Sequence, residues 1–260
     1  MPAPDAFDVR EFARTAQGRL RDEWSAAELG GVAPNDLRMI AFLLRIEGGT
    51  MAYLRNVLVT PMHKDARVTA FLVTWAFEKF WIADALGFVL DANGAAVPAA
   101  TDAVDPRPSG RTRRGPVSRA VGSIVSGETL IAAHLASSLV SDAVVRAGYA
   151  TLAASTPAVA ALAARLSAVD ERHARFFRSE VHRRLVASAR AVSLAQRELR
   201  RETYPLGAAD LSDDERRFFA SRLAESGADA LLEAELRDVG YLDAPTIDRV
   251  MSGLLRHPSP

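Results

Sequence analysis

The amino-acid sequence predicts an all-α protein that folds as one helical domain over residues 1–260. Three observations support this fold class. Apolar residues recur with helical periodicity through most of the chain, and no pair of alternating segments is joined by a hairpin-type turn. The composition is rich in Ala, Leu, Arg and Glu, which are good helix formers. Four long periodic segments are divided two and two by a long connection, which is the plan of a helical bundle with a crossover.

The expected helices follow from capping and breaking signals along the chain. Five long helices are expected at about residues 5–24, 36–59, 65–90, 126–154 and 157–186. Asn35 or Asp36 can cap the second of these, and Thr156 can cap the fifth, with Pro157 at its first position. Shorter amphipathic helices are expected at 188–203, 213–224, 227–238 and 244–255. The bundle core is therefore placed at about 36–186, with a helical extension at about 187–256.

The connection between the third and fourth long helices is unusually long for a single domain. Residues 91–116 contain four of the thirteen prolines, and an arginine cluster formed by Arg107, Arg111, Arg113 and Arg114. Connections of this length are usually functional or mobile. The cluster is either a solvated loop or a contact for a phosphopantetheine arm or an acidic carrier protein.

Composition excludes several classes of function. Lys and Arg together number 32, as do Asp and Glu, so no overall charge attracts nucleic acid or an anionic membrane. The absence of cysteine excludes disulfides, thiolate metal sites and a cysteine nucleophile. The first residues show no secretory signal, and no uncharged run approaches the roughly 18 residues that span a bilayer. A cytoplasmic protein without a membrane or nucleic-acid partner is expected.

Ionisable residues lie within the apolar stripe of each long helix of the expected core. They are Glu47, Lys79, Asp142, and the pair Asp170 and His173. The last two are three residues apart, which places a carboxylate and an imidazole on one helix face. An unpaired charge buried on such a face costs several kcal/mol, so these groups must pair with one another or bind a cation.

Three segments carry a resemblance to a known superfamily. WAFEKFWIADALGFVL resembles a helix of the type W-x-x-E-E-x-x-H-x-x-x-L, AAHLASSLVSDAVVRAGYATLA resembles A-x-H-x-x-x-x-x-x-x-E with a later Tyr, and SAVDERHARFFRSEV resembles D-E-x-x-H-x-x-F-Y-R. These are motifs of the ferritin-like di-iron carboxylate superfamily, and the similarity, over about residues 40–210, looks closest to its arylamine N-oxygenase-like and acyl-carrier-protein desaturase-like branches. The resemblance implies a ferritin-like four-helix bundle with additional N- and C-terminal helices.

The resemblance also implies a ligand set for two iron ions, of which this chain retains only part. Glu47 would have the role of the single Glu on the first bundle helix, and Asp142 that of the third. Asp170 and His173 would stand for the final Glu-x-x-His. Iron or manganese, if present, would bind these four residues, since carboxylates and imidazole suit such ions.

The second bundle helix departs from that pattern. Lys79 and Ile82 stand where the family supplies Glu and His, so one position repels a metal and the other cannot ligate it. Glu78, one turn before Ile82, is a candidate replacement. We therefore expect no metal, and expect the Lys79 ammonium among the carboxylates, at least one of which then has a raised pKa and can act as a general acid or base.

Other side chains are candidates for contact with a small-molecule substrate in the bundle core. They are Glu78, Trp75, Trp81, His134, Tyr149 and Phe177. The aromatic members either pack the core or line an apolar tunnel, and His134 is either a satisfied core histidine or part of the cavity. The amphipathic helices after residue 188 can pack on the bundle or form a homodimer.

Three functions remain open. The first is a metal-independent biosynthetic enzyme that uses Lys79, Glu47, Asp142, Asp170 and His173 for acid/base or electrostatic catalysis of cyclisation, isomerisation or condensation. The second is a non-haem iron oxidase or oxygenase with a reduced metal site. The third is a non-catalytic binding protein or partner subunit.

Overall fold

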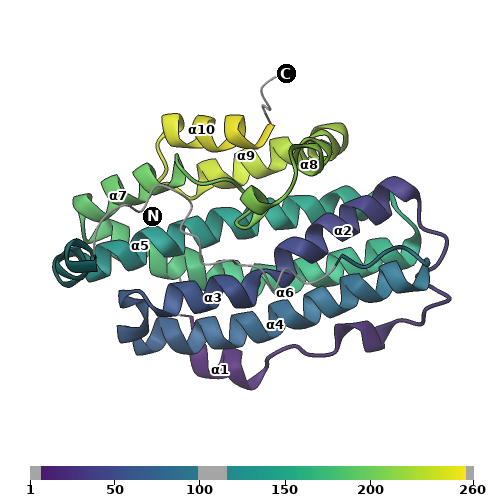
Figure 1. Cartoon of the computed structure of the whole chain (residues 1–260), viewed down its shortest axis with the longest axis horizontal. Coiled ribbons are helices and arrows are strands. Elements are labelled where there is room, and N and C mark those ends of the chain that lie inside the picture. The colour runs from purple at the N-terminus through teal and green to yellow at the C-terminus, as the bar shows by residue number, and fades with distance from the viewer. Residues whose placement is uncertain (1–6, 99–115, 256–260) are drawn as a thin grey trace.

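Helices form nearly all of the regular structure of the chain. The computed structural model describes residues 7–98 and 116–255, side chains of 61 and 116–126 excepted, and no β-strand occurs among them. This confirms the all-α prediction for that part of the chain. The helices are α1 Val9–Arg14, α2 Pro34–Gly48, α3 Thr50–Leu58, α4 Ala66–Ala92, α5 Pro116–Ala150, α6 Pro157–Val186, α7 Ala189–Leu199, α8 Asp213–Ser226, α9 Ala228–Asp238 and α10 Ala244–Leu255 (Figure 1).

The N-terminal third differs most from the expected helices. The prediction of a single helix at 5–24 was wrong, because the described part of this segment forms only α1 and a 3₁₀ turn at Leu20–Glu23. Gly18 lies between them, and Arg19 has a left-handed backbone with φ of 45°. Glycine is a poor residue for a helix interior, and a left-handed residue cannot continue one. The chain instead runs extended against α4, where it contributes backbone groups to the buried site described below.

The second expected helix, at 36–59, is divided into α2 and α3. The break lies at Gly49, directly after Gly48, and glycine has low helix propensity. The expected cap at Asn35 or Asp36 was also wrong, since Ala33 is the N-cap and Pro34 the first helical residue. Asp36 instead accepts a hydrogen bond from Arg222 of α8 at 2.9 Å.

Two other helices, α6 and α8, begin with ordinary N-capping side chains, whereas α5 begins earlier than expected. Thr156 caps α6 by accepting a hydrogen bond from the Val159 amide, with Pro157 at the first position as expected. Ser212 and Glu215 form a capping box at the start of α8. The fourth expected helix begins at Pro116, earlier than the predicted start near 126.

Long helices pack along one another around a shared core. α5 packs against α6, and α2 packs against α4. α5 also contacts α7 and α9, so that the C-terminal helices cover one side of it, while α1 lies against α4 on the opposite side (Figure 1). Buried residues of the long helices and of the C-terminal helices α7 to α10 form one continuous apolar core among the described residues.

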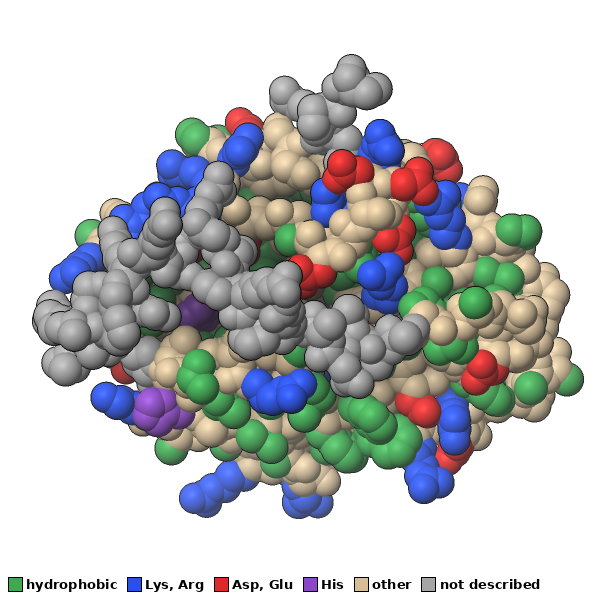
Figure 2. All heavy atoms as spheres, viewed as in Figure 1, with side chains coloured by type: hydrophobic (Ala, Val, Ile, Leu, Met, Phe, Trp, Pro, Cys, Tyr) green, Lys and Arg blue, Asp and Glu red, His purple; other side chains and the backbone are tan. Residues whose placement is uncertain are grey.

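One segment is apolar enough to be compared with a membrane span. Within Gly127–Ala154 the most apolar 18-residue window has a mean hydropathy of 1.3, and 83% of that window is buried inside the protein. Burial in the core accounts for this composition, because a central helix is apolar on most sides. On the visible surface, side chains of both charges occur, and hydrophobic side chains gather on the lower part over the α3 and α4 region (Figure 2).

Candidate functional site

The centre of the protein contains a lysine enclosed by carboxylates from three other helices. Lys79 Nζ on α4 donates to Glu47 Oε1 of α2 at 2.9 Å and to Asp170 Oδ2 of α6 at 2.7 Å. Asp142 Oδ1 of α5 lies 3.6 Å from the same nitrogen. All four side chains are at least 96% buried. The convergence expected from their positions on apolar helix faces is therefore present.

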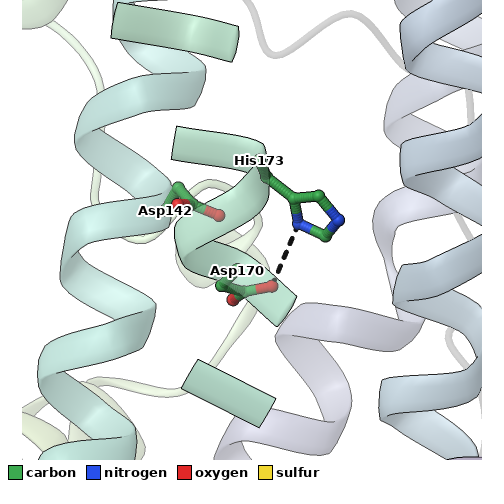
Figure 3. A group of neighbouring side chains, drawn as sticks. All are labelled: Asp142, Asp170 and His173. Carbon is green, nitrogen blue, oxygen red and sulfur yellow. Dashed lines mark hydrogen bonds and ion pairs between the residues drawn. The ribbon is translucent and has the colours of Figure 1, made fainter. Parts of the chain in front are cut away.

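The cluster continues from Asp170, which also contacts the imidazole of His173. His173 Nδ1 lies 3.1 Å from Asp170 Oδ1, and His173 Nε2 lies 2.6 Å from Glu78 Oε2. Figure 3 shows Asp170 and His173 on α6, one turn apart, facing the region of Asp142 on α5. Glu78 also accepts from the Gln17 backbone amide at 2.6 Å and from Arg172 at 3.3 Å.

Two further side chains hold the cavity-facing carboxylates. The Tyr149 hydroxyl donates to Glu47 Oε1 at 2.5 Å. Arg146, one turn after Asp142 on α5, pairs with Asp142 Oδ2 and also with Glu235 of α9. Asp142 Oδ1 is buried and has no hydrogen-bond partner in the described part of the chain. The ammonium and the guanidinium therefore leave this one carboxylate oxygen unsatisfied.

Burial and charge perturb the acids of the cluster in opposite directions. Burial raises the pKa of Glu47 to about 7 and that of Asp142 to about 6, and the nearby Asp170 carboxylate adds to both shifts. Burial alone would raise the pKa of Asp170, but Lys79 and His173 outweigh it, and the pKa is lowered. The pKa values of Glu47 and Asp142 are therefore close enough to neutral pH for these carboxyls to exchange protons there.

The pKa values of both bases in the cluster are raised, which favours their charged forms. Burial alone would lower the pKa of Lys79, but the surrounding carboxylates outweigh burial and raise it. The pKa of His173 is also raised, because its bonds to Asp170 and Glu78 outweigh its burial. The Lys79 ammonium is therefore a permanent positive charge beside two carboxyls that titrate.

A cavity connects this cluster to the surface. It has a volume of about 230 Å³, and Glu47, Lys79 and Asp142 are among its lining residues. Trp75, Tyr53 and Ser138 form part of its wall, with the Tyr53 hydroxyl 3.1 Å from Ser138 Oγ. The break between α2 and α3 lies at Gly49, which also lines it. This volume is below the roughly 300–1,000 Å³ of pockets for drug-sized ligands, so it suits a molecule smaller than those.

The candidate substrate contacts are only partly at this cavity. Trp75 lines it, whereas Glu78, Trp81, His134, Tyr149 and Phe177 do not. Trp81 packs edge-on against Phe77 and Phe80, and Phe177 packs behind Trp75 with ring centroids 6.1 Å apart. His134 is mostly buried, which lowers its pKa. Tyr149 and Glu78 contact the cluster away from the cavity: Tyr149 donates to Glu47, and Glu78 lies against His173.

Several residues of the site had no visible signal in the sequence. The wall near the opening includes Leu206, Gly207, Asp210 and Leu211, from the segment between α7 and α8. The backbone amide of Gln17 reaches Glu78 only because residues 15–19 are not helical. Thr50, three residues after Glu47, also lines the cavity, and helical spacing from Glu47 could have suggested it. Tyr53 lies six residues after Glu47, a spacing that does not indicate a shared helix face.

The donor set was tested against the two-iron centre that the sequence resemblance implies. Ligand atoms of Asp142, Asp170 and His173 lie within 4.8 Å of one another. However, the Lys79 ammonium lies against Asp170 and Glu47, and buried Ile82 offers no ligand. Both nitrogens of His173 also face carboxylates. These residues do not fit a pair of iron ions.

Comparison of the chain with protein-family models, curated proteins and solved structures finds no match in any of the three.

Proposed function

We propose that this chain is a metal-independent enzyme that acts on a small organic molecule by acid/base catalysis within a ferritin-like four-helix bundle. One observation carries the proposal: a cavity reaches Glu47, whose pKa is raised to about 7, beside a permanent lysine ammonium. A general acid or base works best when its pKa is near the operating pH. The raised pKa is produced by burial among charges, an arrangement common at active sites.

In this proposal Glu47 is the group that moves a proton. Its carboxylate takes a proton from a carbon, or from a hydroxyl, of the bound molecule and returns it to another atom. The donor bond breaks as the new bond forms, and nothing is oxidised or reduced. Isomerisation and cyclisation by addition fit this balance, and condensation fits it when the returned proton goes to the departing hydroxyl, which leaves as water. Asp142, with a pKa of about 6, is the second candidate for the proton at the same cavity.

Lys79 has an electrostatic role in the proposal. An ammonium fixed in a buried site stabilises negative charge that develops on the substrate, without reorganisation at the moment of reaction. Asp170 and His173 do not line the cavity, so they are positioning residues that hold Lys79 in place. Tyr149 positions Glu47 in the same way.

A second candidate function is an iron or manganese oxidase with a single-metal site. The gathering of Asp142, Asp170 and His173 favours it, and the position of Lys79 argues against it. The third reading, a non-catalytic binding protein or partner subunit, predicts no turnover by the isolated chain. A carrier-protein contact at Arg107–Arg114 lies outside the described residues, and a homodimer remains a proposal.

Turnover of a metabolite extract distinguishes these functions. Extract of the source organism is incubated with the protein and compared by mass spectrometry with an incubation containing Glu47→Gln. We expect a compound to be consumed and an isomer or condensation product to appear, equally with chelator and without oxygen. Loss of turnover under chelator or anaerobic conditions would establish the oxidase instead. An extract unchanged by the wild-type chain would refute the enzyme proposal.

A further inference from the structure

The buried cluster has the composition of a divalent-cation site in which the cation is a side chain. Three carboxylates, from Glu47, Asp142 and Asp170, face one point, and the Lys79 ammonium occupies it. The three nitrogen–oxygen distances are 2.9, 3.6 and 2.7 Å. Carboxylate oxygens bind divalent transition metals at about 2.0–2.2 Å, so this shell would close on an ion by moving Glu47 and Asp170 inward by under about 1 Å and Asp142 by about 1.5 Å.

The cluster also contains a fourth candidate ligand, His173, and one carboxylate oxygen that lacks a hydrogen bond. A nitrogen of His173 lies within 4.8 Å of ligand atoms from Asp142 and Asp170, and would exchange its contact with Asp170 or Glu78 for the ion. Asp142 Oδ1 is buried without a hydrogen-bond partner in the described part of the chain, although it faces the ammonium at 3.6 Å. A single positive charge therefore leaves one oxygen of this shell unsatisfied, whereas a divalent ion would supply twice the charge.

We infer that the Lys79 ammonium is an internal cation that closes a latent divalent-metal site formed by Glu47, Asp142, Asp170 and His173. The ligands suit manganese, iron or zinc, because they combine hard oxygens with one imidazole. An ion has a route to the site, because Glu47, Lys79 and Asp142 line the cavity. In the natural chain the ammonium repels the ion and occupies its place. This inference does not depend on the reaction that the cavity supports.

Two substitutions of Lys79 separate the charge of the ammonium from the space that it fills. Lys79→Ala removes both and leaves room for an ion at the position of Nζ. Lys79→Met removes the charge, but keeps a stem that reaches the position of Cε and blocks the same space. Both variants leave the buried carboxylates without their cation, so both should melt at a lower temperature than the wild type in metal-free buffer.

Binding is measured with Mn²⁺ alone, from the loss of the free-ion signal in electron paramagnetic resonance, together with the melting temperature. We expect Lys79→Ala to bind about one Mn²⁺ per chain and to regain thermal stability, as ligand linkage requires. The wild type and Lys79→Met should bind none. The double variant Lys79→Ala, Asp170→Asn should bind at least about 100-fold more weakly than Lys79→Ala, since it lacks a ligand.

Two results would overturn the inference. One is stoichiometric Mn²⁺ binding by the wild type with the affinity of Lys79→Ala, which would show that the ammonium excludes nothing. The other is a folded Lys79→Ala that binds no Mn²⁺. If Lys79→Ala does not fold in metal-free buffer, refolding from urea decides. Recovery with Mn²⁺ alone supports the latent site, and failure with and without Mn²⁺ contradicts it.

Discussion

Replacing Glu47 by glutamine should change how the stability of the protein depends on pH. Glutamine has nearly the shape of a protonated glutamic acid. Only Oε1 of Glu47 accepts hydrogen bonds, from Lys79 and Tyr149, within the described residues. A glutamine oxygen can accept the same two bonds, so the substitution removes the titration and keeps the contacts.

The size of the effect follows from the shift of the pKa. Burial raises the pKa of Glu47 from 4.5 to about 7, so the folded protein holds this proton more tightly than the unfolded chain does. The resulting stability is fully present below pH 4.5 and is lost as the pH rises through about 7. One pKa unit corresponds to about 1.4 kcal/mol, so the shift is about 3 kcal/mol in the free energy of unfolding.

Urea unfolding at pH 5, 7 and 8.5 measures this difference. Near pH 5 the wild type and Glu47→Gln should be about equally stable, because Glu47 is protonated there. At pH 8.5 the variant should be the more stable, by up to about 3 kcal/mol. Asp142 has a pKa of about 6 and loses stability over a similar range in both proteins, so it cancels in the comparison.

Glu225→Gln provides the matched control. Its side chain is 60% exposed and pairs with Arg222 on the same helix, so its stability curve should parallel that of the wild type. Parallel curves for Glu47→Gln and the wild type would refute the reasoning, as would a variant that is less stable at pH 8.5. Either result would mean that folding does not raise the pKa of Glu47, which would remove the observation that carries the acid/base proposal.

Three further predictions concern neighbouring features. Tyr149→Phe removes the bond that favours ionised Glu47, so the Glu47 pKa measured by carbon-13 NMR should rise further; an unchanged or lower pKa would contradict this. Gly148→Ala should destabilise by about 1–3 kcal/mol, because its Cβ would lie 2.9 Å from a side chain of α2 and 3.0 Å from one of α8. Gly87→Ala, with nothing within 4 Å, should instead stabilise by up to about 1 kcal/mol, and equal effects on urea unfolding would refute the packing argument. Dialysis of the wild type against EDTA should leave the melting temperature unchanged, whereas a decrease would indicate a bound structural metal.

The long helices could be predicted from the sequence because their signals are local. Apolar periodicity, the Thr156 cap and the following proline depend only on neighbouring residues. The convergence of Lys79 with the carboxylates could also be predicted, since charges on apolar helix faces must find partners. The contact of His173 with Glu78, in contrast to its contact with Asp170, follows neither from helix periodicity nor from capping. It depends on how far α4 and α6 are rotated relative to each other.

Features that depend on the packing of distant segments could not be predicted. The break at Gly49 and the non-helical stretch around Gly18 contain residues that a helix tolerates at modest cost, so packing decides between the two outcomes. The cavity wall at Leu206 and Gly207 comes from a loop that lies far from Glu47 in sequence. The candidate contacts Trp81 and Phe177 follow the helical spacing of the core, but spacing alone does not indicate which aromatic side chain borders a cavity.

The enclosed ammonium of Lys79 also has a consequence for the cell that makes this protein. A positive charge joined to the backbone is delivered with every copy at translation, in a ratio of one to one, and cannot be lost by dilution or captured by a competing protein. Under the inference that this ammonium takes the place of a metal ion, the interior would be complete as soon as the chain has folded, whatever the supply of trace elements. The same amine has a single oxidation state, so by itself it can help to move protons but not electrons.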